Sequence, residues 1–520
     1  MHNVADVLIV GGGPAGMMAG LLFARTGVGV RVLEKHADFF RDFRGDTVHP
    51  STMEILDQLG LLGRFLERPH ERVDKAEIRV AGRNYTIGDL SHLNTPAPFI
   101  AMMPQWEFLD FLRDEAALYP SFALEMEAEA TAFIEDGGRV VGVRLADGRE
   151  LRAGKLVVAT DGRASLVRKL EMLPLTQLGA PMDVLWFRLP KADNIGDKLR
   201  GAVETGRMAV LIDRRTYWQA AFLIPKGAAG EVKARGVGWI RAQIQAMFPD
   251  LDLGGTGGLE SEADLHLLSV ALDRLGRWHR PGLLAIGDAA HAMSPIGGIG
   301  INLAIQDAVA TANILVAPLA RGENPDALLH KVQARRQFPT RVIQAGQKAA
   351  QDNIIGTVLS GTPITGAPQI VRLLDRFPRL RRIPGADHRA RRAAGKGSIA
   401  GGLNPPRACS GRRRRPEAGD GGVVAALVGL APPPLHHPAG GPPPRASSGR
   451  ISAQAQLAIS ASRFWTIASK NCSVVIHGWS GPIRSARSLV ILPSSTVSMQ
   501  TFSSVSAKRT TSGVLSNRPR

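Results

Sequence analysis

The chain has 520 residues with 64 Lys and Arg against 46 Asp and Glu, a formal net charge of +18, and it is long enough for two or three domains around a large core. The charge is uneven, because residues 391–520 hold 18 Lys and Arg and 2 Asp and Glu, which leaves 46 against 44, or +2, for residues 1–390. The total charge would suggest a nucleic-acid partner, but its location argues against a specific one for the first three quarters of the chain.

Three further features narrow the class of protein. No early stretch is typical of an export signal, and no run of about 18 apolar residues predicts a membrane span. The chain has two cysteines, Cys409 and Cys472, and both lie in the last quarter. Their placement excludes a disulfide framework and a cysteine metal site from residues 1–390, and we expect no metal and a cytoplasmic location.

The first predicted element is a dinucleotide-binding turn. Four apolar residues, 7–10, lead directly into Gly11-x-Gly13-x-x-Gly16, and a helical pattern follows. Glycines at these positions let the backbone turn sharply and approach a pyrophosphate at the helix N-terminus. An unbroken apolar strand of this kind predicts a parallel sheet that is covered on both faces.

An acidic residue extends this pattern. A second strand, residues 28–33, ends at Glu34, which lies 18 residues after Gly16. At an offset of roughly 20 residues such an acid accepts hydrogen bonds from a ribose. Taken alone, Arg44 has two interpretations, a contact to a cofactor phosphate or a solvated surface charge, because guanidinium matches phosphate oxygens but surface arginines are common.

The next elements are predicted to be structural. Residues 51–60 form an amphipathic helix with Ser51 as its N-cap. Residues 105–119 form a second helix, whose apolar stripe includes Trp106 and packs in the core without contacting a cofactor. Three short runs between residues 131 and 153 form a β-meander.

The parallel-sheet pattern returns at residues 156–160, an apolar strand that ends in Asp161-Gly162. From about residue 181 to residue 273, alternating β-like runs predict an α+β segment on a mostly antiparallel sheet. Alternation puts Trp186 and Phe187 on opposite faces of that sheet, so no more than part of the aromatic set there can line one cavity.

A second glycine-rich turn follows the apolar strand at residues 282–286. Here Gly287-Asp288 precedes further glycines and a long helix from about Leu303. Backbone N–H groups at such a helix start can face an anion or a polar ring edge. Asp288 could instead be a turn or cap residue, and His291 is expected to be structural rather than an acid or base.

The pattern of predicted strands and helices ends at about residue 381. Residues 451–520 contain 16 serines and no acid, and such bias argues against a packed domain and is typical of a disordered basic arm. Our hypothesis is different: the abrupt break indicates an out-of-frame translation of a GC-rich gene. Resequencing that finds one continuous frame through this point would refute it.

The three motifs, Gly11-x-Gly13-x-x-Gly16 with Glu34, Asp161-Gly162 and Gly287-Asp288, together resemble the FAD-dependent aromatic hydroxylases of the para-hydroxybenzoate hydroxylase type, including the ubiquinone-biosynthesis-like hydroxylases. The match covers about residues 4–375 and departs from the family at the C-terminus. It implies an α/β fold, with a Rossmann-like FAD-binding domain on a mainly parallel sheet and an α+β substrate domain on a mostly antiparallel sheet. The implied divisions are 1–180 and 276–380 for the FAD-binding domain, 181–275 for the substrate domain and 381–520 for the tail.

The resemblance also implies the site. The adenosine pyrophosphate of FAD would lie on the first turn, Asp288 would bind the ribityl or pyrophosphate portion, and Asp161-Gly162 would serve FAD and the passing NAD(P)H. The expected cofactor contacts are Gly11, Gly13, Pro14, Ala15, Gly16, Glu34, Lys35, Arg44, Gln105, Asp161, Gly162, Gly287, Asp288, Pro295, Gly300, Ile301 and Asn302. The environment of the isoalloxazine ring is assigned to Pro295, Gly297 and Gly298, without a compulsory acid or base, and substrate orientation to Arg214, Tyr217 or Gln219.

The activity implied by the resemblance is reduction of FAD by NAD(P)H, reaction with dioxygen to a flavin hydroperoxide, and transfer of one oxygen atom to a phenolic or similarly electron-rich ring. NAD(P)H would be a transient co-substrate, since the chain has no second dinucleotide fingerprint. Three alternatives stay open: a reductase or dehydrogenase of the same fold, a non-enzymatic flavin-binding protein, and nucleic-acid binding through the tail. Whether the protein is a homodimer stays open too.

Overall fold

A computed structural model describes residues 5–40, 47–191, 199–214, 216–252, 258–377, 476–478 and 487–489. The chain divides into two compact units, Met1–Gly411 and Arg412–Arg520. The described part of the second unit is one antiparallel pair of short strands, β23 (Ile476–Gly478) and β24 (Arg487–Leu489). The predictions made for the tail therefore lie almost entirely outside the described residues, and the account below concerns the first unit.

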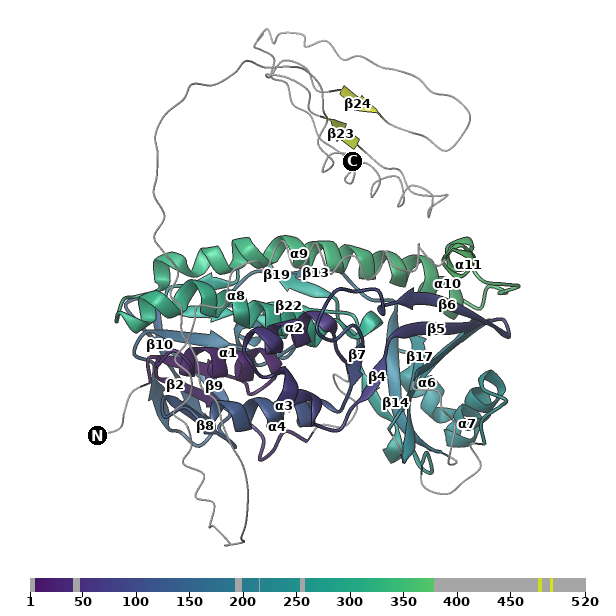
Figure 1. Ribbon diagram of the computed structural model, residues 1–520, viewed down its shortest axis with the longest axis horizontal. Helices are drawn as coiled ribbons and strands as arrows, with labels where there is room; N and C mark the ends of the chain where they lie inside the picture. Colours follow the sequence, from purple (N-terminus) through teal and green to yellow (C-terminus); the bar gives the residue numbers. More distant parts are fainter. Residues whose placement is uncertain are drawn as a thin grey trace, which may run out of the picture. The chain divides into compact units, whose positions relative to one another are not determined.

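A six-stranded sheet carries the first glycine-rich turn (Figure 1). Its strands lie in the order β20-β21-β12-β1-β2-β8, and every neighbouring pair is parallel except β20 with β21. The bounds are β1 Val7–Val10, β2 Val30–Leu33, β8 Phe122–Glu125, β12 Leu156–Ala159, β20 His279–Arg280 and β21 Leu283–Ala285. The central strands β1 and β12 are buried at every position, which explains their unbroken apolar sequences and confirms the predicted fold class.

Four long helices pack around this sheet. Their bounds are α1 Pro14–Ala24, α4 Gln105–Ala116, α8 Gly300–Ala320 and α9 Leu329–Ala350. Helix α1 contacts both α4 and α8, and α9 lies along α8 (Figure 1). The largest hydrophobic cluster joins α1, α4 and α8 to the central strands, so α8 is a core element. Helix α8 begins at Gly300, earlier than the predicted Leu303.

Among the described residues, one segment has the length and apolar composition of a membrane span. This segment, Ile296–Ala320, has a mean hydropathy of 1.5, and 67% of its most apolar stretch is buried inside the fold. It consists mainly of α8, which packs against α1 and α9 as a core helix does.

A seven-stranded sheet forms the second large element, in the order β18-β14-β17-β16-β15-β5-β6 (Figure 1). Its bounds are β5 Lys75–Val80, β6 Arg83–Asp89, β14 Met182–Pro190, β15 Leu199–Glu204, β16 Arg207–Asp213, β17 Tyr217–Pro225 and β18 His266–Leu268. All its pairs are antiparallel except β5 with β15. Helices α6 (Ala229–Ala234) and α7 (Gly236–Met247) cover one face.

Strands β5 and β6 lie outside the segment 181–275 in which the sequence predicts this sheet. They come from residues that the sequence divisions assign to the first part of the FAD-binding domain. Most side chains of β5 and β6 are exposed or only half-buried, and β6 is the edge strand of the sheet with β5 next to it. Their sequences therefore alternate too weakly to reveal the sheet that they join.

The remaining elements are short. The predicted β-meander is present as an antiparallel sheet of β9 Ala130–Asp136, β10 Arg139–Leu145 and β11 Glu150–Arg152. Two further sheets have the orders β3-β7-β4 (Thr47–Val48, Ile100–Met102 and Glu71–Val73) and β13-β19-β22 (Leu175–Gln177, Asp273–Leu275 and His291–Ala292). The other helices are α2 Pro50–Gln58, α3 Leu62–Leu66, α5 Leu166–Lys169, α10 Gly356–Leu359 and α11 Gln369–Arg376.

The start of α2 differs from the prediction. The N-cap is His49, whose backbone is extended (φ −84°, ψ 162°), and Pro50 takes the first helical position. Proline suits that position because its fixed φ is already helical and it lacks an N–H group that would have no partner there. Ser51 lies inside the first turn and is buried, so its prediction as the N-cap was wrong.

Candidate active site

The first glycine-rich turn joins β1 to α1, and two of its glycines are required by the chain itself. A Cβ on Gly16 would lie 2.0 Å from the carbonyl oxygen of Gly11, and one on Gly11 would lie 2.7 Å from the backbone of Thr160. Gly13, the N-cap of α1, differs, because the nearest atom that its Cβ would meet is 4.0 Å away. The space beside Gly13 fits a bound group such as a pyrophosphate at the N-terminus of α1, next to Pro14 and Ala15.

Glu34 follows β2 and reaches back to this turn. Its Oε2 accepts a hydrogen bond from the N–H of Gly12 (2.9 Å), and its Oε1 accepts from the N–H of His36 (3.2 Å) and contacts the His36 ring. The side chain is 12% exposed. The carboxylate is thus fixed at the edge of the turn, where a ribose could reach it, whereas the neighbouring Lys35 is exposed.

Asp161-Gly162 follows β12, which lies next to β1. The Oδ2 of Asp161 accepts from the N–H of Leu166 (2.7 Å), while Oδ1 is buried and has no hydrogen-bond partner among the described residues. Burial raises the pKa of Asp161, and hydrogen bonds from Ser165 and Leu166 offset this only in part. Asp161 is therefore a largely buried residue at the start of α5, and Gly162 beside it has a φ of 80°.

The second glycine-rich turn lies against the first. Gly287 has a φ of 61°, and a Cβ on it would lie 3.0 Å from the Cβ of Ala15. This close packing brings Asp288 to the N-terminal end of α1, although the two positions are far apart in the sequence. Asp288 is partly exposed (31%), and Arg163 donates to its Oδ2 at 3.2 Å.

Arg168 of α5 binds both the second glycine-rich turn and Asp273 of β19, and its sequence context did not predict these contacts. Its guanidinium donates to the carbonyl oxygens of Asp288 (2.7 Å) and Ala289 (3.0 Å) and forms an ion pair with Asp273 (2.8 Å). Both charged side chains are less than a tenth exposed. Arg168 therefore holds the backbone of the second turn directly behind Asp288.

A second buried ion cluster lies beneath Gly287. Asp307 of α8 accepts from the N–H of Gly287 (3.1 Å), from Arg336 (2.7 Å) and from His291 (2.6 Å). Burial opposes ionisation of Asp307, but the charges and hydrogen bonds of His291 and Arg336 outweigh it and hold the pKa of Asp307 below its usual range. His291 is 1% exposed, which fits the structural role that the sequence suggested.

The segment Ser294–Gly300 leads from β22 into α8. It is called the flavin loop below because it contains the residues that the sequence resemblance assigns to the isoalloxazine ring. Gly297 and Gly298 have φ values of 76° and 59°, and a Cβ on Gly298 would lie 2.1 Å from Thr47 Oγ1. Thr47 donates to the carbonyl oxygen of Gly298 (2.7 Å), and so does Asn302 Nδ2 (3.2 Å). Only glycine adopts this backbone without strain, so the loop needs its two central glycines.

The side chain of Asn302 is occupied by the protein itself. Its Oδ1 accepts from His49 N (2.9 Å) and from Thr52 Oγ1 (2.8 Å), and its Nδ2 also donates to the carbonyl oxygen of Thr47 (3.3 Å). The side chain is completely buried. The first turn of α8, which also contains Gly300 and Ile301, thus offers backbone N–H groups rather than this side chain.

Arg44 lies outside the described residues. The strand that follows it, β3, pairs with β7 so that Thr47 is opposite Met102. Gln105 begins α4 shortly after β7 and is half-buried. Because β7 pairs with β3 and leads into α4, the start of α4 lies close to β3. It therefore also lies close to the flavin loop, whose Gly298 accepts a hydrogen bond from Thr47.

The three substrate candidates lie on one face of the seven-stranded sheet. On β17, Trp218 and alternate residues pack beneath α6 and α7, so Tyr217 and Gln219 lie on the opposite face, as alternation predicted. Arg214 follows β16 and donates from Nε to Gln219 Oε1 (2.8 Å). The same face carries Trp186 and packs in one hydrophobic cluster with Ile296 of the flavin loop.

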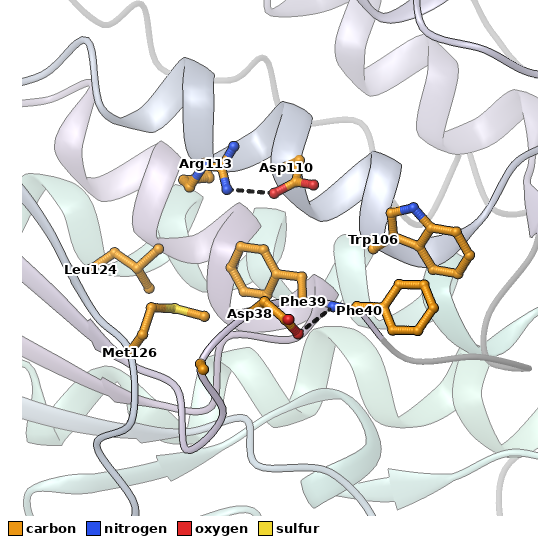
Figure 2. Close-up of a pocket in the computed structure, with 9 residues that line it drawn as sticks. Asp38, Phe39, Phe40, Trp106, Asp110, Arg113, Leu124 and Met126 are labelled. Carbon is orange, nitrogen blue, oxygen red and sulfur yellow. Dashed lines mark hydrogen bonds and ion pairs between the residues drawn. The ribbon is translucent and has the colours of Figure 1, made fainter.

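A pocket of about 380 Å³ lies between helix α4 and residues 37–40, the segment that comes shortly after Glu34 in the chain (Figure 2). Its lining residues are Ala37, Asp38, Phe39, Phe40, Trp106, Asp110, Arg113, Leu124 and Met126. None of the predicted site residues is among them. Trp106 packs against Phe40 (ring centroids 4.8 Å apart) and lines this pocket. It is only partly buried, but it packs against the core cluster that contains Leu109 and Leu112 of the same stripe, as predicted.

Comparison with known proteins agrees with this geometry. The family model described as "FAD binding domain" matches residues 4–346. The chain is 32% identical over 382 residues to 6-methylpretetramide 4-monooxygenase of Streptomyces rimosus, a match that covers 73% of this chain and 90% of the relative. It is also 32% identical over 346 residues to a rifampicin monooxygenase of Streptomyces venezuelae, covering 64% of this chain and 68% of the relative.

Solved structures show the same fold. The crystal structure of p-nitrophenol 4-monooxygenase from Pseudomonas putida matches with a TM-score of 0.61 at 20% identity and covers 76% of this chain and 100% of that chain. Aklavinone-11 hydroxylase, in a ternary complex with FAD and aklavinone, matches with a TM-score of 0.59 at 22% identity and covers 71% of this chain and 73% of that chain. The relatives are monooxygenases, and the family model spans both glycine-rich turns and the seven-stranded sheet. The chain belongs to the FAD binding domain family and is a FAD-dependent monooxygenase of the aromatic hydroxylase type.

Proposed function

We propose that this monooxygenase uses NAD(P)H and dioxygen to hydroxylate a phenolic or similarly electron-rich aromatic substrate, bound between the flavin loop and the seven-stranded sheet. One observation supports the proposal: Trp186 of this sheet face and Ile296 of the flavin loop pack against the same hydrophobic cluster. When bound, FAD supplies the redox chemistry, taking electrons from NAD(P)H and activating dioxygen. The protein's residues bind FAD, orient the substrate and exclude water from the site.

FAD would be held at two ends. The N-terminus of α1 beside Gly13 would bind the pyrophosphate, and Glu34 would accept hydrogen bonds from the ribose. At the other end, backbone N–H groups of the flavin loop would favour negative charge on the reduced ring. Asp288, fixed by Arg163 (3.2 Å), would bind the ribityl portion that joins these ends.

Arg214 and the apolar face around it would orient the substrate. A guanidinium on this face can stabilise a phenolate or another anionic oxygen on the ring by a charge-assisted hydrogen bond. Gln219, 3% exposed, fixes the Nε of Arg214 in place, and the Tyr217 ring lies 4.8 Å from the guanidinium of Arg188. Trp186 would exclude water from the reacting face of the ring. The names of the relatives give 6-methylpretetramide, rifampicin and p-nitrophenol as their substrates, which supports the aromatic class.

The test begins with the purified protein and a flavin absorbance spectrum. NAD(P)H consumption is then measured across single-ring phenols and polycyclic phenols, under dioxygen labelled with ¹⁸O. We expect an aromatic compound to accelerate consumption and one labelled oxygen atom to enter the product. Accelerated consumption without label in any product would refute hydroxylation and support the reductase alternative.

A matched pair of variants tests the substrate face. Arg214→Gln removes the cation from the sheet face that shares a hydrophobic cluster with Ile296 of the flavin loop, and we expect KM for an acidic phenol to rise by about tenfold or more, since a hydrogen bond to a charged group is lost. Arg207→Gln is the control, because Arg207 begins β16, the strand that Arg214 follows, but donates to Gln243 of α7 on the other face (2.7 Å). An equal rise of KM in both variants would contradict the assignment of this face.

A further inference from the structure

Three buried glutamines line one face of α9 and the π-helical turn that follows it. Gln344, Gln347 and Gln351 are spaced by three and four residues, so their side chains lie on the same side of the helix. They are 0%, 4% and 0% exposed. Glutamine is seldom fully buried, and when it is, its amide needs partners.

Gln347 binds the start of the flavin loop. Its Oε1 accepts from the N–H of Ser294 (3.1 Å), and its Nε2 donates to the carbonyl oxygens of Ser294 (3.0 Å) and Ile296 (3.0 Å). The amide therefore pairs with Ser294 as a neighbouring strand would. Gln351 adds a bond from its Nε2 to Ser294 Oγ (2.8 Å), and the same Oγ accepts from the N–H of Ile296 (3.3 Å).

These bonds determine which way the peptide groups of the loop point. In a trans peptide the C=O and the following N–H point in opposite directions. Gln347 holds the carbonyl of Ile296, so the N–H of Gly297 points away from α9. At the other end, Thr47 and Asn302 hold the carbonyl of Gly298, so the N–H of Ile299 points away from them.

We propose that Gln347, supported by Gln351, is a positioning residue that turns the N–H groups of the flavin loop toward the isoalloxazine ring and so sets the reduction potential of the bound FAD and the coupling of NAD(P)H use to hydroxylation. The inference rests on the proposed function, in which this loop faces the ring. Neither glutamine touches the reacting atoms. Gln347 acts through three backbone groups, two of Ser294 and one of Ile296, and Gln351 acts through Ser294 Oγ.

The perturbation is Gln347→Met, which keeps the length and approximate volume of the side chain and removes all three bonds to the loop. The matched control is Gln344→Met on the same helix face. Gln344 is equally buried and donates to the carbonyl oxygens of Asp273 (2.7 Å) and Ala292 (3.1 Å), outside the flavin loop. Both variants lose buried hydrogen bonds and should lose comparable stability.

The two variants should differ at the flavin. We expect Gln347→Met to bind FAD with a lower midpoint potential, because N–H groups that no longer face the ring stabilise its reduced, anionic form less. We expect product formed per NAD(P)H consumed to fall by about tenfold or more, with hydrogen peroxide released instead, since small misplacements in an active site cost that much. Gln344→Met should keep the wild-type potential and ratio.

The inference is overturned if Gln347→Met keeps the wild-type potential and product ratio, or if Gln344→Met shifts both by the same amount. If Gln347→Met does not fold, Gln351→Met decides, since it removes a single bond, to Ser294 Oγ, and should lower the potential by a smaller amount. A wild-type potential in that variant overturns the inference. A wild-type protein that binds FAD and hydroxylates no aromatic compound refutes the proposed function instead, and the comparison of potentials still decides the role of Gln347.

Discussion

Replacing Arg168 by methionine should destabilise the protein and loosen the second glycine-rich turn. Arg168 is 8% exposed and Asp273, its partner, is 9% exposed, with 2.8 Å between them. The variant removes one half of a buried ion pair and leaves the other charge without compensation. Breaking a buried pair in this way costs about 3–5 kcal/mol.

The contacts of Arg168 bring the expected loss to the middle of that range. Asp273 keeps a hydrogen bond from the N–H of Ala292 (3.2 Å), which offsets part of the loss. The carbonyl oxygens of Asp288 and Ala289 lose their donors, and each costs about 1–3 kcal/mol unless water replaces the guanidinium. We therefore expect Arg168→Met to lose about 4 kcal/mol of unfolding free energy.

Denaturant unfolding measures the loss of stability, and FAD content measures the loosening of the second glycine-rich turn. The free energy of unfolding is compared for Arg168→Met, Asp273→Leu and the double variant. Because each single variant leaves a buried charge unpaired and the double variant leaves none, the double variant should be more stable than the sum of the single losses implies. A loss below about 1 kcal/mol for Arg168→Met, or strict additivity in the double variant, would refute the buried-pair reasoning.

Three further predictions concern other contacts of the site. Gly16→Ala should yield protein without FAD, because the new Cβ would lie 2.0 Å from the carbonyl oxygen of Gly11. Gly346→Ala, where a Cβ meets nothing within 4 Å, should keep its flavin spectrum. Asp307 has a lowered pKa, so it contributes stability above its unfolded pKa of about 4 that is lost as pH falls through its folded value; Asp307→Asn should flatten the acid limb of the stability curve, and an unchanged limb would contradict this. Thr47→Val removes the hydroxyl bond to the carbonyl oxygen of Gly298 (2.7 Å) and should lower product per NAD(P)H without loss of FAD, which a product assay with flavin quantification would check.

The fold class could be read from local patterns because parallel, fully buried strands leave an unmistakable signal. Strands β1 and β12 are apolar throughout, and each ends in a turn that carries glycine. The contact between Gly287 and Ala15 follows from the same logic, since the parallel strands β1, β12 and β21 all end at one edge of the sheet.

The contacts that Arg168 and Gln347 make to hold the site could not be predicted from local sequence patterns. Arg168 and Gln347 are polar residues whose sequence neighbours indicate a surface position, and only the three-dimensional structure brings them to buried partners. Their partners lie far away in the chain: Arg168 binds Asp288, 120 positions on, and Gln347 binds Ser294, 53 positions back. Periodicity reports how a residue relates to its own helix or strand and carries no information about such a partner.

The order of strands in the six-stranded sheet also affects how the chain is made. Strand β12 ends at Ala159, but its outer neighbour β21 begins only at Leu283, after the ribosome has synthesised β13 to β20. At about 5–20 residues per second, β12 waits on the order of ten seconds with one edge unpaired. All four of its residues are destined for the core, and an exposed apolar edge of this kind is a template for aggregation. The nascent chain is therefore expected to depend on a chaperone until residue 285 has left the exit tunnel.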